Sequence, residues 1–463
     1  MKNLFSILTG SAAGFMAIGA ASAADLPSKK AAPAQYVKIC DAYGAGYFYI
    51  PGSDTCLKIG GQVRAEYTYR AGAATSPKDG AGAFTQNQGG TIFGRDETAF
   101  RGRAYMTLDA RTKTSYGDLK TFIQLRMTDE TTNSGPIAGG KLAGQSTAYF
   151  QGYGPGTATY VTNAYIQFAG ITAGRAQSMF DFYTHSYEVL GSSFVSDQPT
   201  NLLAYTAKFG SGFSATLSAE DRSARIIADT QGLAPTKTKS QIITYDGARV
   251  PDLVANLRVD QSWGAAQISG AYHAVKAGNS GVTTTSTATG YAFSAGVKVL
   301  LPMLAAGDSI SIQGTLAKGA TDYTNPLNFF SGISSVYKNK YTVGVSANDG
   351  YVQTNGQLAL AKTYSFFAGI QHFFSPQVRS SLFSSYLNVS YAQSLGTAAN
   401  SKVYLVGTNV IWMPVKGVEI GPEVVYTHVA LSSSIPANLP SATVGKPNSG
   451  GDVRARLTIR AAF

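Results

Sequence analysis

The chain of 463 residues has few charged side chains, which make up only 14% of it. A soluble protein of this length normally carries about 25% charged residues. The mean hydropathy is nevertheless near zero, too low for a bundle of membrane-spanning helices. Glycine (51), tyrosine (27) and phenylalanine (23) are abundant instead. A β-barrel in lipid explains both shortages, because apolar outward and polar inward residues alternate along each strand.

Long apolar segments are also missing beyond the N-terminus. Residues 1–23 combine Lys2, a weakly apolar stretch and Ala21-Ser22-Ala23, a pattern typical of a cleaved export signal. Glycine and serine interrupt the stretch, so a membrane anchor is the poorer interpretation. We predict a signal peptide at 1–23 and a periplasmic N-terminal segment at 24–39.

Cysteine is scarce, and the two that occur, Cys40 and Cys56, lie 16 positions apart. An exported chain meets an oxidising compartment, so we expect them to form a disulfide that closes a loop at 40–56. Neither a C-x-x-C motif nor a nearby histidine is present, which argues against a metal or redox site. We expect no cofactor.

A single unit recurs along residues 57–463: about ten alternating residues, a short turn and a return strand. In the clearest case, Ser211-Gly212 forms the turn and the preceding strand has one apolar face of Leu203, Tyr205, Ala207 and Phe209. Long polar stretches, at 71–94, 131–158, 276–289 and 319–340, separate the hairpins. At roughly 50 residues per hairpin and loop, the length predicts an all-β fold, a transmembrane antiparallel β-barrel of about 16 strands.

The C-terminal strand separates this fold from a soluble sandwich or propeller, which would also alternate. From Val453 to Phe463 the odd-numbered residues are apolar, whereas Arg454, Arg456, Thr458 and Arg460 form the other face. Barrels of the bacterial outer membrane commonly end in such a strand. We therefore predict an outer-membrane location, with Phe463 as the assembly signal and membrane lipid around the outer face.

Several segments resemble one known family. CDAYGAGYFYIPGSDTCLKIGG, FRGRAYMTLDARTKTSYGDLKTFIQLR, MFDFYTHSY, SPQVRSSLFSSY and WMPVKGVEIGPEVVYT are similar to landmarks of the alphaproteobacterial (Rhizobiales-type) porins. The resemblance covers most of the chain after the signal. It implies a homotrimeric general porin whose third loop folds inward as a constriction loop. Residues 179–200 occupy the expected place of that loop.

The candidate site is the constriction of a water-filled channel for small hydrophilic solutes and ions. By alternation, the barrel wall offers lumen-facing arginines: Arg64, Arg101, Arg103, Arg126, Arg454, Arg456 and Arg460. The constriction loop offers Asp181, Glu188 and Asp197. A cationic wall opposite an acidic loop would set up a transverse field that orders water and orients dipolar solutes. Any one arginine could instead be an ion-paired wall residue, and the loop acids could instead tether the loop.

The formal charge of +11 favours a mild anion preference. The basic residues are spread at strand spacing, which argues against a nucleic-acid surface. A substrate-specific channel is the alternative function, and Phe182, Tyr183 and Tyr187 are the only hint of an aromatic path. A barrel enzyme or adhesin is a weaker alternative, because the four histidines are scattered and have no partner motif.

Overall fold

The computed structural model describes most of the chain after the first 37 residues. The described residues are 38–71, 98–130, 156–225, 241–242, 244–245, 247, 249–279, 282–324, 335–338, 341–344, 349–352, 357–391, 400–431 and 449–463. The predicted signal peptide at 1–23 and nearly all of the segment at 24–39 lie outside them.

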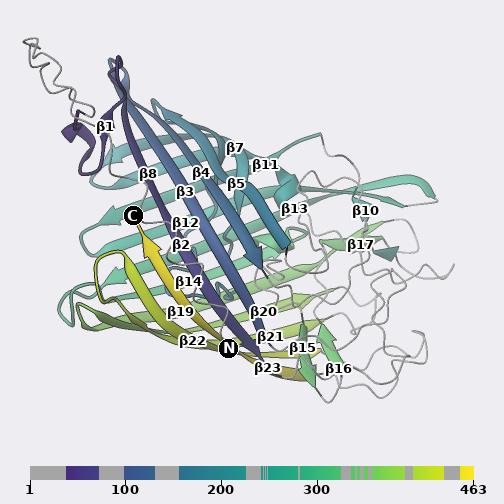
Figure 1. The fold of residues 1–463 in the computed structure, drawn as a ribbon. Coiled ribbons are helices and arrows are strands. Elements are labelled where there is room, and N and C mark those ends of the chain that lie inside the picture. Colours follow the sequence, from purple (N-terminus) through teal and green to yellow (C-terminus); the bar gives the residue numbers. More distant parts are fainter. Residues whose placement is uncertain are drawn as a thin grey trace, which may run out of the picture.

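Sixteen long strands of the described residues form one closed antiparallel barrel (Figure 1). Each strand pairs with both neighbours, and the ring closes where the first strand meets the last, from Gln62 opposite Ala462 to Arg70 opposite Arg454. The predicted barrel of about 16 strands is therefore confirmed. In order around the ring the strands are β2 (Cys56–Arg70), β3 (Thr98–Thr114), β4 (Gly117–Glu130), β5 (Gly156–Phe168), β6 (Ile171–Gln177), β7 (Pro199–Gly210), β8 (Phe213–Glu220), β11 (Asp252–Gln261), β12 (Gly264–Asn279), β13 (Val282–Leu300), β14 (Ser309–Lys318), β19 (Lys362–Ser375), β20 (Val378–Ser390), β21 (Ser401–Trp412), β22 (Val418–Leu431) and β23 (Ser449–Ala462).

Short strands and 3₁₀ turns lie outside the set of sixteen wall strands. They are β1 (Phe48–Tyr49), β9 (Gln241–Ile242), β10 (Thr244–Tyr245), β15 (Ser335–Lys338), β16 (Tyr341–Gly344), β17 (Gly350–Val352), β18 (Leu358–Leu360) and the 3₁₀ turns η1 (Asp41–Tyr43), η2 (Arg222–Arg225) and η3 (Thr321–Thr324). In the described part of the chain, no helix has the length and apolar character needed to cross a membrane.

Alternation decides which face of each strand is apolar. In β21, every odd-numbered residue is buried and every even-numbered residue is exposed; Tyr404, Val406 and Trp412 are among the exposed side chains. Every wall strand exposes at least one large hydrophobic side chain in this way. In water such a belt would be unfavourable by about 25 cal/mol per Å². The outer face is therefore suited to lipid, and the polar face lines the lumen.

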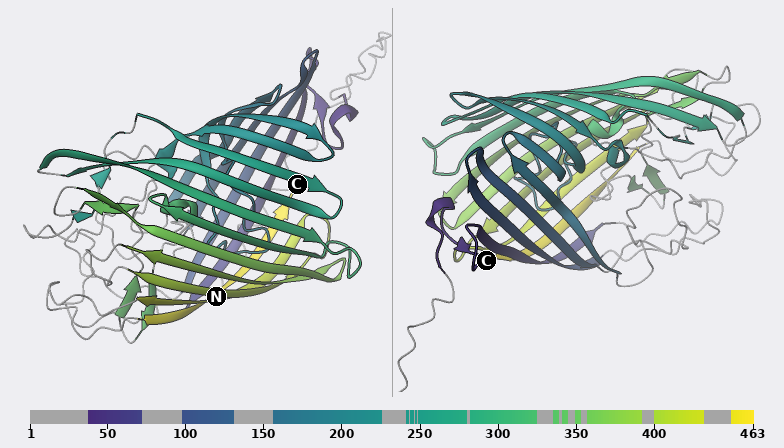
Figure 2. Two further views of the ribbon diagram at one scale, coloured as in Figure 1. Left: turned by 180° about the vertical axis from the view of Figure 1, so that it is seen from behind. Right: turned by 90° about the horizontal axis from the view of Figure 1, so that it is seen from above.

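Tight turns join the strands at one end of the barrel, which we name the turn rim. Ala169-Gly170 and Ser211-Gly212 both have positive φ at each position, the geometry of a two-residue type I′ hairpin. The turn predicted at Ser211-Gly212 is thus confirmed. The longer connections leave the opposite end, the loop rim. Viewed from behind and from above, the wall strands form one tilted, continuous sheet (Figure 2).

The prediction of a loop at residues 276–289 is wrong. Residues 276–289 are rich in glycine, serine and threonine, yet β12 continues to Asn279 and β13 begins at Val282. Lys276 pairs with Thr287 and Ala277 with Ser286, so the hairpin extends the sheet. Threonine and valine favour strands because their branched side chains suit an extended backbone, and here that tendency outweighs the polar composition.

The predicted disulfide between Cys40 and Cys56 is confirmed, with the two Cα atoms 5.9 Å apart. Cys56 is the first residue of β2, so the closed loop attaches directly to the wall at the turn rim. Tyr47 is buried beside both cysteines, and the guanidinium of Arg111 lies 5.4 Å from the centre of its ring. A cross-link over 16 residues stabilises such a loop by about 3 kcal/mol.

Candidate functional site

The connection between β6 and β7, residues 178–198, lies against the inside of the barrel wall; we name it the inner loop. The first half of the inner loop is hydrogen-bonded to three strands of the wall. Asn256 of β11 donates to the Met179 carbonyl (2.5 Å), and Gln267 of β12 donates to the Phe180 carbonyl (3.2 Å). The Tyr183 N–H donates to Gln313 of β14 (3.0 Å). Because Pro199 and Thr200 belong to β7, the loop ends two residues earlier than the predicted range of 179–200.

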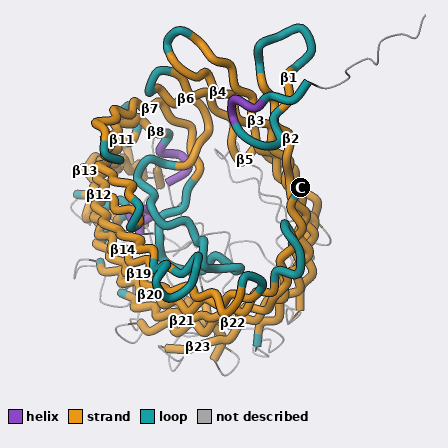
Figure 3. Tube along the Cα trace, turned by 90° about the vertical axis from the view of Figure 1, so that its left-hand side faces the viewer, coloured by secondary structure: helices purple, strands orange, loops and turns teal. Residues whose placement is uncertain are grey.

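The second half of the inner loop continues along the same side. The N–H groups of Val189 and Leu190 donate to the carboxylate of Glu423 on β22, at 2.7 and 2.6 Å. The Phe194 N–H donates to Ser385 of β20 (2.9 Å). These contacts carry the loop from β11 round to β22, and Figure 3 shows it inside the ring of strands.

Aromatic side chains of the inner loop are fixed to the wall. The rings of Tyr183 and Phe367 stack at 4.0 Å, and the Tyr187 hydroxyl donates to Ser309 at 2.8 Å. Both tyrosines are buried. They therefore hold the loop in place, and they do not form an open aromatic path for a solute.

The three loop carboxylates predicted to face the arginines contact other residues of the inner loop or, in the case of Asp181, also Arg225 of η2. Glu188 accepts from the N–H groups of Ser192 (2.6 Å) and Ser193 (3.0 Å). Asp181 has a fully buried side chain, and Asp197 pairs with His185 at 3.0 Å. These contacts agree with the alternative interpretation of the acids as tethers. Their contribution to a field across the lumen stays a prediction.

A cation that the sequence analysis missed anchors this region. Arg225, in η2, is 2% exposed and lies 3.4 Å from both Asp181 of the inner loop and Asp322 of η3. It also donates to Ser196 (2.7 Å) and stacks 4.1 Å from the centre of the Tyr323 ring. Burial raises the pKa of Asp322 to about 6, although Arg225 opposes the rise. No periodic pattern marks Arg225, because it lies between strands.

His185 is buried in the inner loop, where its neighbours favour its charged form. Its Nδ1 faces Asp197 and its Nε2 faces the Ser193 carbonyl (3.1 Å), so both nitrogens meet acceptors. Burial alone would lower the pKa of His185, but Glu188 and Asp197 raise it to about 9. A raised pKa stabilises the loop fully below about pH 6.5, and this stabilisation is lost as the pH rises through about 9.

We therefore expect current fluctuations of the loop to increase between pH 7 and 10 in single-channel recordings. His185→Asn removes the titrating group and tolerates the local φ of 56°. Its recordings should depend less on pH over this range. Equal pH dependence of both proteins would contradict the role of His185.

The predicted arginines lie on four adjacent strands, β23, β2, β3 and β4, on the face opposite the exposed apolar side chains; we name this set the arginine wall, and its role in the pore stays a prediction. Glu66 of β2, which the sequence analysis also missed, lies at its centre. Glu66 pairs with Arg101, and with Arg64 and Arg456 at 3.6 and 3.5 Å. Its side chain is fully buried.

The carboxylates of the arginine wall and of the neighbouring strand β22 each pair with more than one cation. Asp452 forms ion pairs with Arg70 and Arg454, Glu419 with Arg379 and Arg460, and Asp109 with Arg111 and Lys120. Together with Glu66, four carboxylates therefore form ion pairs with nine cations among the described residues. Two further arginines of the wall have other kinds of contact: Arg103 donates to Thr128 (3.2 Å), and Arg126 stacks 4.0 Å from the centre of the Tyr160 ring.

The arginine wall and the inner loop lie on opposite sides of the barrel. In the ring of sixteen strands, β12 is eight positions from β2 in either direction. The inner loop contacts strands from β11 to β22, whereas the arginine wall occupies β23 to β4. The open lumen therefore lies between them.

Comparison with known proteins agrees with this architecture. The family model described as the porin subfamily matches residues 25–450. The chain belongs to the porin family. Porin Omp2b of Brucella canis and of Brucella abortus (strain 2308) are each 32% identical to it over 267 residues, which is 57% of this chain. The match spans 64% of the length of those porins. These relatives confirm the predicted alphaproteobacterial porin family.

A solved structure shares the fold of the porin. The outer membrane channel DcaP of Acinetobacter baumannii superposes with a TM-score of 0.58 at 16% identity, covering 90% of this chain and 99% of that one. Family membership and the apolar outer face place the porin in the bacterial outer membrane, as predicted. In barrels of that membrane the turn rim faces the periplasm and the loop rim faces the cell exterior.

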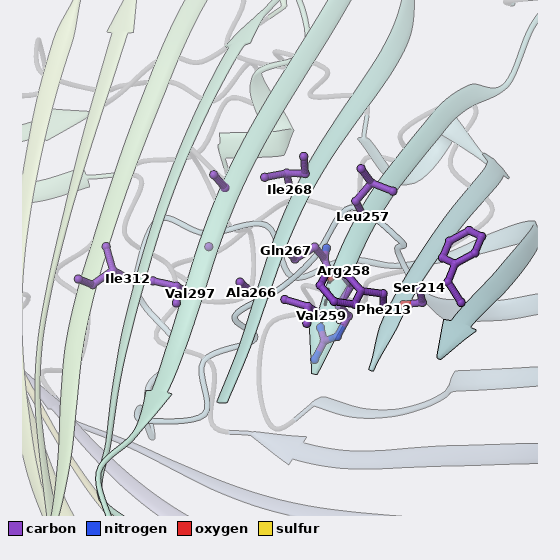
Figure 4. A pocket seen from close by; sticks show the side chains of 13 residues that line it. Phe213, Ser214, Leu257, Arg258, Val259, Ala266, Gln267, Ile268, Val297 and Ile312 are labelled. Atoms are coloured by element: carbon purple, nitrogen blue, oxygen red, sulfur yellow. Dashed lines mark hydrogen bonds between the residues drawn. The ribbon is translucent and has the colours of Figure 1, made fainter. Parts of the chain in front are cut away.

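An apolar groove of about 460 Å³ lies on the outer face of the porin near the turn rim (Figure 4). Phe213, Leu257, Ile268 and Ile312 line it with exposed side chains that point away from the lumen. Such a surface is suited to the acyl chains of lipids. It is separate from the arginine wall, so we place the functional site in the lumen.

Proposed function

We propose that this porin is a general diffusion channel, through which small hydrophilic solutes and ions cross the outer membrane passively. The observation that carries the proposal is a closed barrel whose lumen has a cationic wall on one side and a polar loop on the other. A barrel of sixteen strands encloses an aqueous lumen because side chains cannot fill it. The inner loop narrows that lumen and sets the size limit for solutes.

We expect the channel to prefer anions mildly, because nine described cations share four carboxylates on β20, β22, β23 and β2 to β4. The test is the zero-current potential of the purified porin in a planar bilayer with a tenfold KCl gradient. The sign should indicate that chloride permeates faster than potassium. A cation-selective potential would contradict the anion preference, and the absence of any conductance would contradict the channel.

A substrate-specific channel is the second candidate. Liposomes containing the porin distinguish the two, because a diffusion channel admits neutral sugars at rates that fall smoothly with size. Saturable uptake of one sugar would favour a specific channel. Membership of the porin family supports transport over catalysis, and hydrolysis without conductance would be the finding that favours an enzyme.

We also propose that the porin assembles as a homotrimer in the outer-membrane lipid. The support is its membership of the porin family and the resemblance of its sequence landmarks to trimeric members. Mass measurement of the detergent-solubilised porin by light scattering would test this, and a monomeric mass would contradict it.

A further inference from the structure

Three cationic side chains and one hydroxyl converge on the lumen side of β2, β3 and β4. Arg64 is directly opposite Arg103 in the register of β2 and β3. Tyr105, two residues after Arg103 on the same face, is directly opposite Arg126 of β4. The Tyr105 hydroxyl lies 3.4 Å from Arg103, and Arg126 interacts with it as well. The guanidinium groups therefore gather around one neutral oxygen.

Two of these arginines, Arg64 and Arg103, have little negative charge beside them in the part of the chain that the structure describes. Arg103 contacts only the hydroxyls of Thr128 and Tyr105, without a carboxylate partner in the described part of the chain. Arg64 shares Glu66 with two other arginines, and its buried Nε–H meets no acceptor among the described residues. Like charges directly opposite each other across a strand pair are destabilising. A bound anion would relieve this repulsion and satisfy the donors.

We propose that Arg64, Arg103, Tyr105 and Arg126 form a binding site for phosphate-type oxyanions within the channel. Guanidinium forks match pairs of phosphate oxygens, whereas chloride cannot use that geometry. A tetrahedral dianion has enough oxygens to accept from three arginines and a phenol together. The site would make the channel prefer phosphorylated solutes. This part of the proposal rests on the proposed channel function.

Position along the lumen supports passage through the site. Arg64 lies six residues from Arg70 and six from Lys58 on β2, which is about 20 Å in each direction. Arg454 beside Arg70 and Arg111 near Lys58 continue the cationic surface toward the two rims. Anions can therefore approach and leave along a basic path, with the proposed site near its middle.

The test uses inorganic pyrophosphate as the probe, added to the porin in a planar bilayer that conducts chloride. We expect pyrophosphate to reduce the current along a saturating curve. Arg103→Gln should raise the half-blocking concentration about tenfold, because a charge-assisted fork is lost. Arg103→Lys keeps the charge but not the fork. It should retain the zero-current potential of the original protein while raising the half-blocking concentration roughly threefold.

Arg258→Gln is the matched control. Arg258 lies on β11, across the lumen, and pairs with Asp260 at 2.8 Å. Its loss should leave the half-blocking concentration unchanged. Equal shifts for Arg103→Gln and Arg258→Gln, or a block that does not saturate, would overturn the site in favour of general surface charge. If Arg103→Gln does not fold, Tyr105→Phe tests the same site and should raise the half-blocking concentration about threefold.

Failure of the oxyanion site can be distinguished from failure of the proposed channel function. Normal chloride conductance without a pyrophosphate block would overturn the oxyanion site and leave the channel intact. The absence of conductance from a barrel that shows heat-modifiable migration on a gel would contradict both the proposed function and the site.

Discussion

Replacing Arg225 by methionine is expected to detach one end of the inner loop and to make the channel noisy. The substitution leaves Asp181 and Asp322 without their buried cation, which typically costs about 3–5 kcal/mol. Wall pairing does not involve Arg225, so we expect the barrel itself to form. Single-channel recordings should show additional conductance levels, and limited proteolysis should cut the porin within residues 178–198.

A charge-neutral variant provides the control for this result. Arg225→Met combined with Asp181→Asn and Asp322→Asn removes the cation together with both carboxylates. Both carboxylates that pair with Arg225 are then neutral, so we expect the recordings to return most of the way to those of the original protein. An Arg225→Met channel as quiet and as protease-resistant as the original would show that the loop is held without this cation.

The barrel wall could be predicted because its cause is local. Residues on a strand alternate between lipid and lumen, and segments such as Leu203 to Phe209 show that period of two in their sequence. The Ser211-Gly212 turn and the faces of the C-terminal strand follow from the same reasoning. The hairpin at 276–289 was missed because polar composition suggests a loop, whereas strand pairing depends on the backbone and on the neighbouring strand.

The interior could be predicted only in part. The resemblance indicated the inner loop, and alternation indicated the arginines, because both depend on order along the chain. The partners of those residues depend on distant segments: Glu66 meets Arg456 from the other end of the chain, and Asp181 meets Arg225 from beyond two strands. No spacing rule connects such pairs. For this reason the contacts of the predicted loop acids, such as that of Asp181 with Arg225, could not be predicted from the sequence.

Glu66 is the position at which one substitution should change selectivity most. Its carboxylate serves Arg64, Arg101 and Arg456, and Glu66→Gln preserves its shape while removing the charge. One unit charge contributes about 0.5 kcal/mol to a monovalent ion about 8 Å away in water, with opposite sign for chloride and potassium, so the ratio changes by about 1 kcal/mol. We therefore expect the chloride-to-potassium permeability ratio to rise roughly fivefold, measured as the zero-current potential in a KCl gradient.

The same substitution should make stability depend on anions in solution. With Glu66 neutral, three lumen arginines lose their shared partner, which destabilises the barrel by about 3 kcal/mol unless anions screen them. Unfolding temperatures of Glu66→Gln should therefore rise with salt more steeply than those of the original porin. Glu419→Gln is the matched control, because Glu419 is 24% exposed and serves two arginines near the turn rim. Selectivity shifts of equal size in both variants would show that charge anywhere in the lumen sets the preference, and that the position of Glu66 does not.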